Sequence, residues 1–403
     1  MNKPVDSPLV TAIEHVRRHH AELTALRRDL HAHPELAFEE SRTSELVAQK
    51  LAGWGIEVHR GLARTGVVGV VRGKRASARS VALRADMDCL PVHETNNFAH
   101  KSKHEGRMHA CGHDGHTTML LGAARYLAET REFAGTVILV FQPAEEGGGG
   151  GQVMMKEGLF QKFPADEVYA LHNYPGLPAG KIAVRAGAMM AATDEVKITI
   201  RGTGGHGAFP HLAVDPVVAA AHVVTALQTI ASRNVEPVDA VVVSVCSMAT
   251  SQIGAFNVIP DAVSLVGTVR SFKPQTRELA ERRVREIAAK VAEAFGARAE
   301  VAYDRGYPAT VNGVRESEFA ARVGRRVFGP ANVITEFEPV MGGEDFSYML
   351  QEKPGAYVFL GQGGGPSSCF LHNPGYDFND EVIPLGAGYL AALAEESLAQ
   401  ARS

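Results

Sequence analysis

The spacing of hydrophobic residues predicts two kinds of structure along the chain. In the first half, short apolar runs alternate with segments whose apolar residues recur at helical spacing. Strands that alternate with helices favour a mostly parallel sheet with helices on both faces. The expected strands are residues 67–71, 80–85, 136–141 and 167–171, and the expected helices are residues 7–31, 41–51, 115–129 and 152–157.

The pattern changes near Ala191. Residues 194–201 alternate strictly between apolar and polar side chains, which is typical of a strand with one buried face. A strand–helix–strand–strand–helix–strand order follows, the split βαβ pattern of a small α+β domain. After about residue 310 the α/β pattern returns. The elements expected in this half are a helix at 215–232, strands at 240–247 and 262–270, a helix at 274–295, a strand at 298–303, a helix at 315–328, an apolar run at 356–360 and a helix at 385–400.

The simplest organisation is one α/β domain, residues 1–190 plus 306–403, interrupted by a smaller ferredoxin-like α+β domain at residues 191–305. Length supports two domains, because 403 residues exceed the size at which a single hydrophobic core keeps growing.

Composition is that of an ordinary soluble globular protein, with 45% hydrophobic and 21% charged residues. A net charge of -4 and the lack of a long basic run argue against nucleic-acid binding. No run of about 18 apolar residues predicts a membrane span, and the start of the chain lacks the apolar core of a signal peptide. Four cysteines are too few for a disulfide framework, so we expect reduced thiols in the cytoplasm.

Metal-ligating residue types follow three of the expected strands. Parallel strands deliver such groups to one edge of a sheet, outside their carboxyl ends. Any one of these residues alone is better explained as a helix cap or a solvated turn, but three strands together favour a site. The residues are Asp86 and Asp88 after strand 80–85, Glu145 and Glu146 after strand 136–141, and His172 after strand 167–171.

Two further segments contain metal-ligating types. Cys111 and His113 open an expected helix, and a thiolate and an imidazole at this spacing both suit zinc-like ions. The alternative is a buried thiol beside a capping His–Asp pair. His372 lies in a glycine- and serine-rich loop near the C-terminus, and Cys369, three residues earlier, is interpreted as a small core residue.

The adjacent carboxylates Glu145 and Glu146 point in different directions, so they can have two different roles. One can bind a metal, which lowers the pKa of a bound water to about 7, while the other takes the proton as a general base. His206 lies in a glycine-rich run that formally matches a dinucleotide-binding fingerprint, but Pro210 follows instead of a helix, so nucleotide binding is not expected. His206 either reaches an adjacent site or is simply solvated.

Several motifs together resemble the hippurate hydrolase branch of the aminoacylase–carboxypeptidase metallopeptidases. This branch includes bacterial N-acyl-amino-acid amidohydrolases and plant hydrolases of auxin conjugates. The resemblance spans nearly the whole chain and implies a zinc-peptidase-like catalytic domain with an inserted dimerisation and lid domain. The matching segments are residues 28–36 (RDLHAHPEL), 84–88 (RADMD), 109–114 (HACGHD), 142–147 (QPAEEG), 171–172 (LH), 341–346 (MGGEDF) and 371–374 (LHNP).

The resemblance implies a centre of two divalent metal ions, with Glu145 as general base and Asp86 as a group that orients a ligand. Arg84 stands where other branches have a histidine ligand, and Cys111 and His113 take its place. A thiolate favours zinc, while manganese, cobalt or nickel are alternatives. Cys111 is the expected bridge between the metals. The implied ligands are Cys111, His113, Glu146, His172 and His372.

In the inserted domain, the resemblance implies that His206 donates to the oxyanion, within its own subunit or across a dimer. Asn257 and Arg270 resemble groups that hold a substrate carboxylate, for which the guanidinium fork is suited. Their alternative roles are a strand-end cap and a solvated edge arginine. The expected assembly is a homodimer or a tetramer.

The expected activity is cytoplasmic, metal-dependent hydrolysis of N-acyl-L-amino acids such as hippurate, N-acetyl or N-aroyl amino acids, without a covalent intermediate. Glu145 would take a proton from water and pass it to the leaving amine. One alternative is a dipeptidase or aminopeptidase of the same family, which would recognise a free substrate amine. Another is a non-catalytic, metal-containing binding protein.

Overall fold

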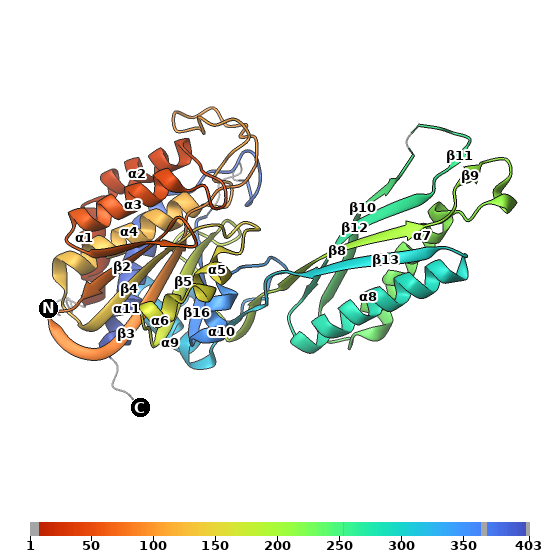
Figure 1. Ribbon diagram of the computed structural model, residues 1–403. Helices are drawn as coiled ribbons and strands as arrows, with labels where there is room; N and C mark the ends of the chain where they lie inside the picture. The colour runs from red at the N-terminus through yellow and green to blue at the C-terminus, as the bar shows by residue number, and fades with distance from the viewer. Residues whose placement is uncertain (1–7, 253, 364–368, 400–403) are drawn as a thin grey trace. The chain divides into compact units, whose positions relative to one another are not determined.

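The computed structural model describes residues 8–252, 254–363 and 369–399, so the outermost residues of the helices expected at 7–31 and 385–400 lie outside it. The chain forms two compact units (Figure 1). Unit 1 comprises Met1–Met189, Val311–Glu338 and Asp345–Ser403, and unit 2 comprises Met190–Thr310 and Pro339–Glu344.

Unit 1 is built on an eight-stranded sheet with the order β1-β2-β4-β3-β5-β16-β6-β15. The strands β4, β3, β5 and β16 are mutually parallel, which confirms the expected mostly parallel sheet. The hairpin of β1 and β2 adds an antiparallel edge that was not expected, because most residues of β1 are exposed and form no apolar run. The strands are β1 (Glu57–Leu62), β2 (Gly66–Arg72), β3 (Arg75–Asp86), β4 (Ala134–Gln142), β5 (Glu167–Tyr174), β6 (Ile182–Ala183), β15 (Val333–Ile334) and β16 (Gly355–Gly361).

Helices cover both faces of this sheet (Figure 1). One group, with α4 and α11 at its centre, also contains α1, α2, α3 and α9, and α5, α6 and α10 form the other. The helices are α1 (Pro8–Arg17), α2 (His20–Ala32), α3 (Ser41–Gly53), α4 (His113–Thr130), α5 (Gly150–Lys156), α6 (Leu159–Lys162), α9 (Val314–Phe328), α10 (Ser347–Glu352) and α11 (Ile383–Ala399), with short 3-10 turns η3 (Pro330–Asn332) and η4 (Asp380–Val382).

The prediction of a single helix over residues 7–31 is wrong. The chain breaks between α1 and α2, where the His19 amide donates to the Val16 carbonyl, three residues back, at 2.9 Å. Neither glycine nor proline marks this break. The helical spacing of apolar residues continues across it, and the sequence therefore predicts one uninterrupted helix.

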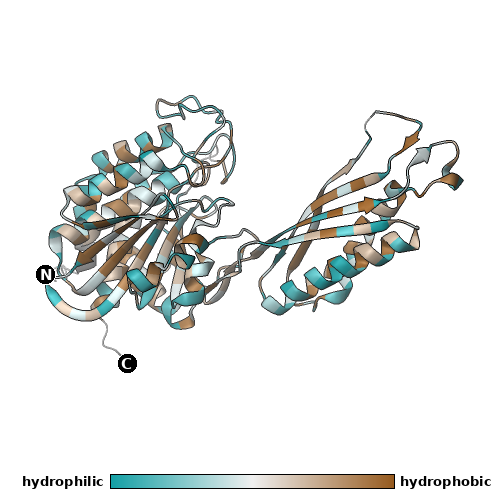
Figure 2. Ribbon diagram, viewed as in Figure 1, coloured by the Kyte–Doolittle hydropathy of each residue, from teal (hydrophilic) through white to brown (hydrophobic). Residues whose placement is uncertain are grey.

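The hydrophobic core of unit 1 lies between the sheet and the α4–α11 layer. Helix α11 is buried on nearly all sides, as expected for a helix inside a large core. Strands are mostly hydrophobic, while the outer helices are hydrophobic on one side only (Figure 2). This packing fixes the carboxyl ends of the central strands at one edge of the sheet.

Unit 2 is a four-stranded antiparallel sheet with the order β10-β12-β8-β13, covered by two helices. This order and connectivity confirm the expected ferredoxin-like fold. The helix expected at 215–232 ends earlier than expected, at Leu227, and a short π-helical turn follows. The elements are β8 (Ala192–Arg201), β9 (Gly205–His206), η1 (Pro210–Leu212), α7 (Pro216–Leu227), η2 (Ile230–Asn234), β10 (Val241–Thr250), β11 (Val258–Ile259), β12 (Ala262–Ser271), α8 (Pro274–Ala294) and β13 (Arg298–Arg305), with β7 (Gly187–Met190) and β14 (Thr310–Asn312) at the unit boundaries.

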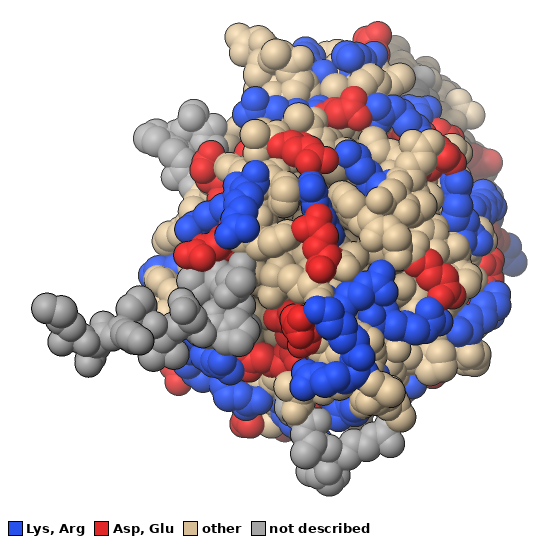
Figure 3. Space-filling view, turned by 90° about the vertical axis from the view of Figure 1, so that its left-hand side faces the viewer, with Lys and Arg blue, Asp and Glu red and all other residues tan. Residues whose placement is uncertain are grey.

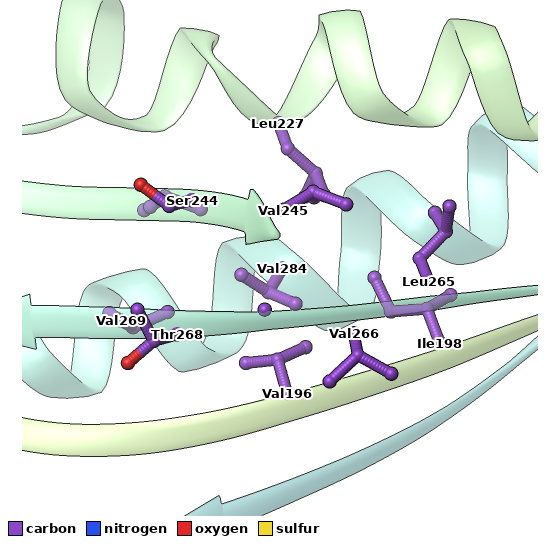
Figure 4. A pocket seen from close by; sticks show the side chains of 12 residues that line it. Val196, Ile198, Leu227, Ser244, Val245, Leu265, Val266, Thr268, Val269 and Val284 are labelled. Carbon is purple, nitrogen blue, oxygen red and sulfur yellow. The ribbon is translucent and has the colours of Figure 1, made fainter. Parts of the chain in front are cut away.

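A small pocket lies in the core of unit 2, between the sheet and its helices (Figure 4). Its lining is almost entirely aliphatic, including Val196, Ile198 and Val284, and its volume is about 10 Å³. A space of this size holds at most one water molecule, so it is a packing defect and not a substrate site.

The surface charge is mixed. On the face shown in Figure 3, Lys and Arg side chains are interspersed with Asp and Glu side chains. This pattern gives no extended positive field for a polyanion on that face. Within the described residues, no helix is both long and apolar enough to cross a membrane.

Candidate metal centre

The expected ligands are brought together by the parallel strands of unit 1. Asp86 at the end of β3 pairs with Gln142 at the end of β4, and Arg84 pairs with Ala170 in β5, two residues before His172. The turn after β4 and the second half of β5 therefore meet at one edge of the sheet, as expected for ligand groups in an α/β fold.

The five residues form two overlapping groups of possible ligand atoms. Cys111, His113 and His172 form one group, and Cys111, Glu146 and His372 form the other, with all atoms of a group within 4.8 Å of one another. The Cys111 Sγ lies 3.5 Å from His172 Nε2, and His372 Nε2 lies 3.2 Å from Glu146 Oε1. Cys111 is the member common to both groups, as a bridging ligand would be.

His113 shows that this arrangement suits a cation. Its Nδ1 faces the backbone oxygen of Asp88 at 3.0 Å and the Asp88 carboxylate at 3.2 Å. With the proton on Nδ1, the lone pair of Nε2 faces the site, and this buried nitrogen has no hydrogen-bond partner among the described residues. Burial opposes a positive charge on His113, but Asp86 and Asp88 outweigh it and raise its pKa to about 10. A pocket that stabilises a proton there also favours a metal ion.

The protonation states of the other two buried candidate ligands, His172 and Cys111, follow from their surroundings. Burial, together with the nearby His116, lowers the pKa of His172 well below its ordinary value, so its ring is neutral. Its Nδ1 lies 2.7 Å from the Asn173 backbone oxygen, which leaves Nε2 facing Cys111. Burial and the carboxylates of Glu146 and Glu145 raise the pKa of the Cys111 thiol well above its ordinary value. A bound cation reverses that effect, because metal binding favours the thiolate.

Local backbone geometry brings Cys111 and His372 to the centre. Gly112 adopts φ +92°, and a Cβ there would lie 2.5 Å from Asn173 Oδ1, so only glycine fits between Cys111 and the start of α4. The His372 amide donates to the Ala110 carbonyl at 2.8 Å, which ties the C-terminal loop to the segment before Cys111.

Asp88 organises the turn that carries Glu145 and Glu146. Its carboxylate accepts the backbone N–H of Glu145 at 3.0 Å and that of Glu146 at 2.9 Å. The sequence marks Asp88 only as one of the acids after β3. Its role depends on contacts 57 and 58 residues away, which no local pattern reveals.

Asp86 contacts a residue to which the sequence assigned no role. Its Oδ1 lies 2.6 Å from Nδ1 of His116, whose Nε2 faces Asn173. Its Oδ2 accepts from Arg84 at 2.7 Å but lies 3.8 Å from His113 Nε2, too far for a hydrogen bond. Asp86 therefore reaches the ligand His172 through the His116 ring, which packs edge-on against it. In the sequence, only the position of His116 at the end of the Cys111–His116 motif indicates that this residue has a role.

A buried ionic network supports the start of α4 from behind. His31 Nδ1 lies 2.8 Å from the Asp114 carboxylate, and the Arg27 guanidinium donates to Asp380 at 2.6 Å and faces Asp114 at 3.5 Å. Burial disfavours the charged ring of His31, but hydrogen bonds with Asp114 and Glu94 outweigh it and raise its pKa to about 9. These contacts give the N-terminal segment 28–36 a structural role beside His113.

Unit 2 carries the other three expected residues, and it does not bring them together. His206 is exposed in β9, where its Nδ1 accepts the Ala208 N–H at 3.0 Å, and the backbone carbonyl of Asn257 accepts the Gly207 N–H at 2.7 Å. Arg270 lies near the end of β12, where Nε donates to Thr268 Oγ1 at 3.0 Å. From Ala262, which follows the β11 strand paired with β9, to Arg270 is eight strand residues, or roughly 26 Å.

A separate group of possible ligands, His15, His19 and Glu129, lies on the surface of unit 1. The Glu129 carboxylate already accepts from Arg125 at 2.9 Å and pairs with His15 at 2.8 Å. This cluster is therefore an ordinary surface ion pair.

The fold and the donor set define a metallohydrolase of the α/β class, with a thiolate, three imidazoles and a carboxylate beside a further acid. The sequence profile of peptidase family M20/M25/M40 matches residues 82–396, and the chain belongs to this family.

Individual relatives agree with this assignment. The chain is 42% identical over 373 residues to the hippurate hydrolase of Campylobacter jejuni, covering 93% of this chain and 96% of that protein. It is 41% identical over 388 residues to IAA-amino acid hydrolase ILR1-like 5 of Arabidopsis thaliana, covering 94% and 88%. The crystal structure of a dinuclear metal-binding peptidase of the M20 family from Bacillus subtilis superimposes with a TM-score of 0.82 at 32% identity, covering 96% of this chain and all of that one.

Proposed function

We propose that this protein is a metal-dependent amidohydrolase that hydrolyses N-acyl-L-amino acids to a carboxylic acid and a free amino acid. The observation that carries the proposal is the convergence of five metal-ligating side chains beside the separate carboxylate of Glu145. Two relatives support the substrate class, since one is a hydrolase of hippurate and the other a hydrolase of IAA-amino acids. Each name describes an acyl group joined to an amino acid.

Cys111, His113, Glu146, His172 and His372 would hold two divalent cations. When bound, such ions lower the pKa of a coordinated water and polarise the substrate carbonyl. Zinc or manganese is the expected metal, with cobalt or nickel as alternatives. A thiolate ligand functions only while reduced, so the cytoplasm is the expected compartment.

Glu145 is the proposed general base. Its side chain is buried, with 6% exposure, and one of its carboxylate oxygens lies within 4.8 Å of ligand atoms of His113 and Glu146. It takes a proton from the attacking water as the oxygen bonds to the acyl carbon. It then gives that proton to the nitrogen as the carbon–nitrogen bond breaks, so the acid and the amine leave without a covalent enzyme intermediate.

His206, Asn257 and Arg270 are the proposed oxyanion and carboxylate groups. Because His206 and Asn257 lie at one end of the unit 2 sheet and Arg270 lies at the other, one copy of unit 2 does not present all three together. In a symmetric dimer, His206 and Asn257 of the second copy would complete the site that contains Arg270 of the first copy. We therefore propose that His206 and Asn257 act in the partner's active site.

The proposed surface for this dimer is strand β10 of unit 2. This strand is one edge of the four-stranded sheet, with one side of its backbone unpaired among the described residues of unit 2, and an exposed edge of this kind is a template for pairing with another strand. Met248 on β10 and Val266 on β12 are each 45% exposed. Pairing of two β10 strands would give the free backbone groups of this edge their hydrogen-bond partners.

Subunit complementation tests the shared site. His206→Ala alone should lower turnover ~100- to 1,000-fold, as loss of an oxyanion donor does, and Glu145→Gln should also be nearly inactive. After subunit exchange, hybrid dimers combine Glu145 of one chain with His206 of the other, so about a quarter of wild-type activity should return in a symmetric dimer. The control mixture of Glu145→Gln with Glu146→Gln should not recover. Verified hybrids without recovered activity would place His206 in its own subunit.

A substrate panel tests the proposed function. We expect hydrolysis of N-benzoyl and N-acetyl amino acids, and little hydrolysis of free dipeptides of the same size. Preferred cleavage of the free dipeptides would instead indicate a dipeptidase or aminopeptidase. If no substrate of the panel is hydrolysed after chelation and reloading of the protein with metal to saturation, the protein is instead a metal-containing binding protein.

A further inference from the structure

The turn that carries Glu145 has an unusual backbone. It begins directly after β4, and Ala144 adopts φ +55°, in the left-handed region that a residue with a Cβ rarely enters. Such a conformation persists only where surrounding contacts hold it. The Ala144 carbonyl accepts the Gly150 amide at 2.9 Å, which closes the turn on its other side.

Glu40 holds the amide of this strained residue. Its side chain is fully buried, and its Oε1 accepts the Ala144 N–H at 2.9 Å. The same oxygen accepts the Phe38 N–H at 3.0 Å, and Oε2 accepts the hydroxyl of Thr65 at 2.6 Å. Glu40 reaches across 104 residues to make this contact, from the segment that follows the N-terminal motif 28–36.

Two carboxylates thus hold three consecutive amides. Glu40 binds the amide of residue 144, and Asp88 binds those of residues 145 and 146. Burial raises the pKa of Glu40 to about 7, with the Asp88 carboxylate adding to the effect. A carboxylate is thus disfavoured at this position, yet it binds the Ala144 amide, which points to a specific need for that bond.

We propose that Glu40 is a positioning residue for Glu145: by holding the Ala144 amide, it keeps the left-handed turn that aims the Glu145 carboxylate at its proton-transfer position. This inference rests on the proposed function, in which Glu145 is the general base. Asp88 holds the backbone amides of Glu145 and Glu146. Glu40 holds the amide of the preceding residue, Ala144, and so sets the backbone direction just before Glu145.

The test compares Glu40→Ala with Glu40→Gln in the metal-loaded protein, with hippurate as substrate. Glu40→Ala should lower kcat about 10- to 100-fold, the scale expected for a misplaced catalytic group, with KM and metal content unchanged. Glu40→Gln should restore kcat to within about twofold, because its amide oxygen can still accept both N–H groups and its NH2 can donate to the Thr65 hydroxyl. If Glu40→Ala does not fold, Glu40→Asp withdraws the oxygen from Ala144 while keeping the charge, and should lower kcat similarly.

Two controls separate positioning from general destabilisation. Thr65→Val removes only the bond to Oε2 and should keep wild-type kcat. Asn312→Ala removes a buried side chain that bonds the backbone of Tyr357, so it destabilises unit 1 without an observed contact to the turn, and should also keep wild-type kcat per folded molecule.

Two results would overturn the inference. One is wild-type kcat in folded Glu40→Ala or Glu40→Asp, and the other is an equal loss in Glu40→Gln. Neither result affects the proposed function, which fails separately if Glu145→Gln retains its turnover.

Discussion

Replacement of Glu145 by glutamine is expected to leave a folded, fully metal-loaded protein that has lost nearly all turnover. Glutamine has the same shape but cannot accept the proton from water, and general base catalysis typically contributes ~100- to 10,000-fold to the rate. The main chain should stay in place, since Asp88 binds the amide of residue 145 and not its side chain. We therefore expect kcat to fall by that factor while KM changes little, as measured by hippurate hydrolysis at saturating metal.

The neighbouring carboxylate is the matched control for this prediction. Glu146→Gln makes the same replacement one residue away, but Glu146 lies in a group of possible metal ligands with Cys111 and His372. This variant should lose bound metal as well as activity, as measured by metal analysis after dialysis. If Glu145→Gln lost metal and Glu146→Gln kept it, the two roles would be exchanged.

Replacement of Cys111 by alanine should have the second-largest effect. Cys111 belongs to both groups of ligand atoms, so its loss weakens both cation sites at once. We expect the variant to bind fewer than two cations per chain. Its activity should fall by more than the ~10- to 100-fold typical for loss of a residue that only supports a ligand. Metal-to-protein ratios and hippurate turnover measure the two effects.

Cys369→Ala is the control for thiol loss. Cys369 lies three residues before His372 and imitates a zinc-binding pair in the sequence, but it packs against the hydrophobic core of unit 1. This variant should keep two cations and wild-type activity. Metal loss in Cys369→Ala together with full metal binding in Cys111→Ala would contradict the proposed ligand set.

The parts of the fold that depend on local pattern were predictable from the sequence. Apolar runs placed the buried strands β3, β4 and β5, and the acids and histidine that follow them identified the edge of the sheet where the site lies. The order of elements in residues 194–303 was sufficient for the ferredoxin-like unit. In each case the pattern of apolar and polar side chains within an element predicts which of its residues are buried, and contacts with distant residues are not needed for that prediction.

Features that depend on distant contacts were not predictable. The break between α1 and α2 lacks glycine and proline, and β1 is too exposed to form an apolar run. Asp88, His116 and Glu40 act through bonds to residues that lie far away in the chain. Backbone amides are the main partners of Asp88 and Glu40, and the side-chain pattern of a sequence does not show which amides are bound. The separation of His206 from Arg270 likewise emerges only from the register of β12 with β8.

A crystal structure of the zinc-loaded protein, with anomalous scattering recorded on both sides of the zinc absorption edge, tests the two-metal centre most directly. We expect two peaks per chain, one bound by His113 and His172, the other by Glu146 and His372, with the Cys111 sulfur between them. A single peak, or zinc bound elsewhere while these five side chains stay unligated, would contradict the two-metal site.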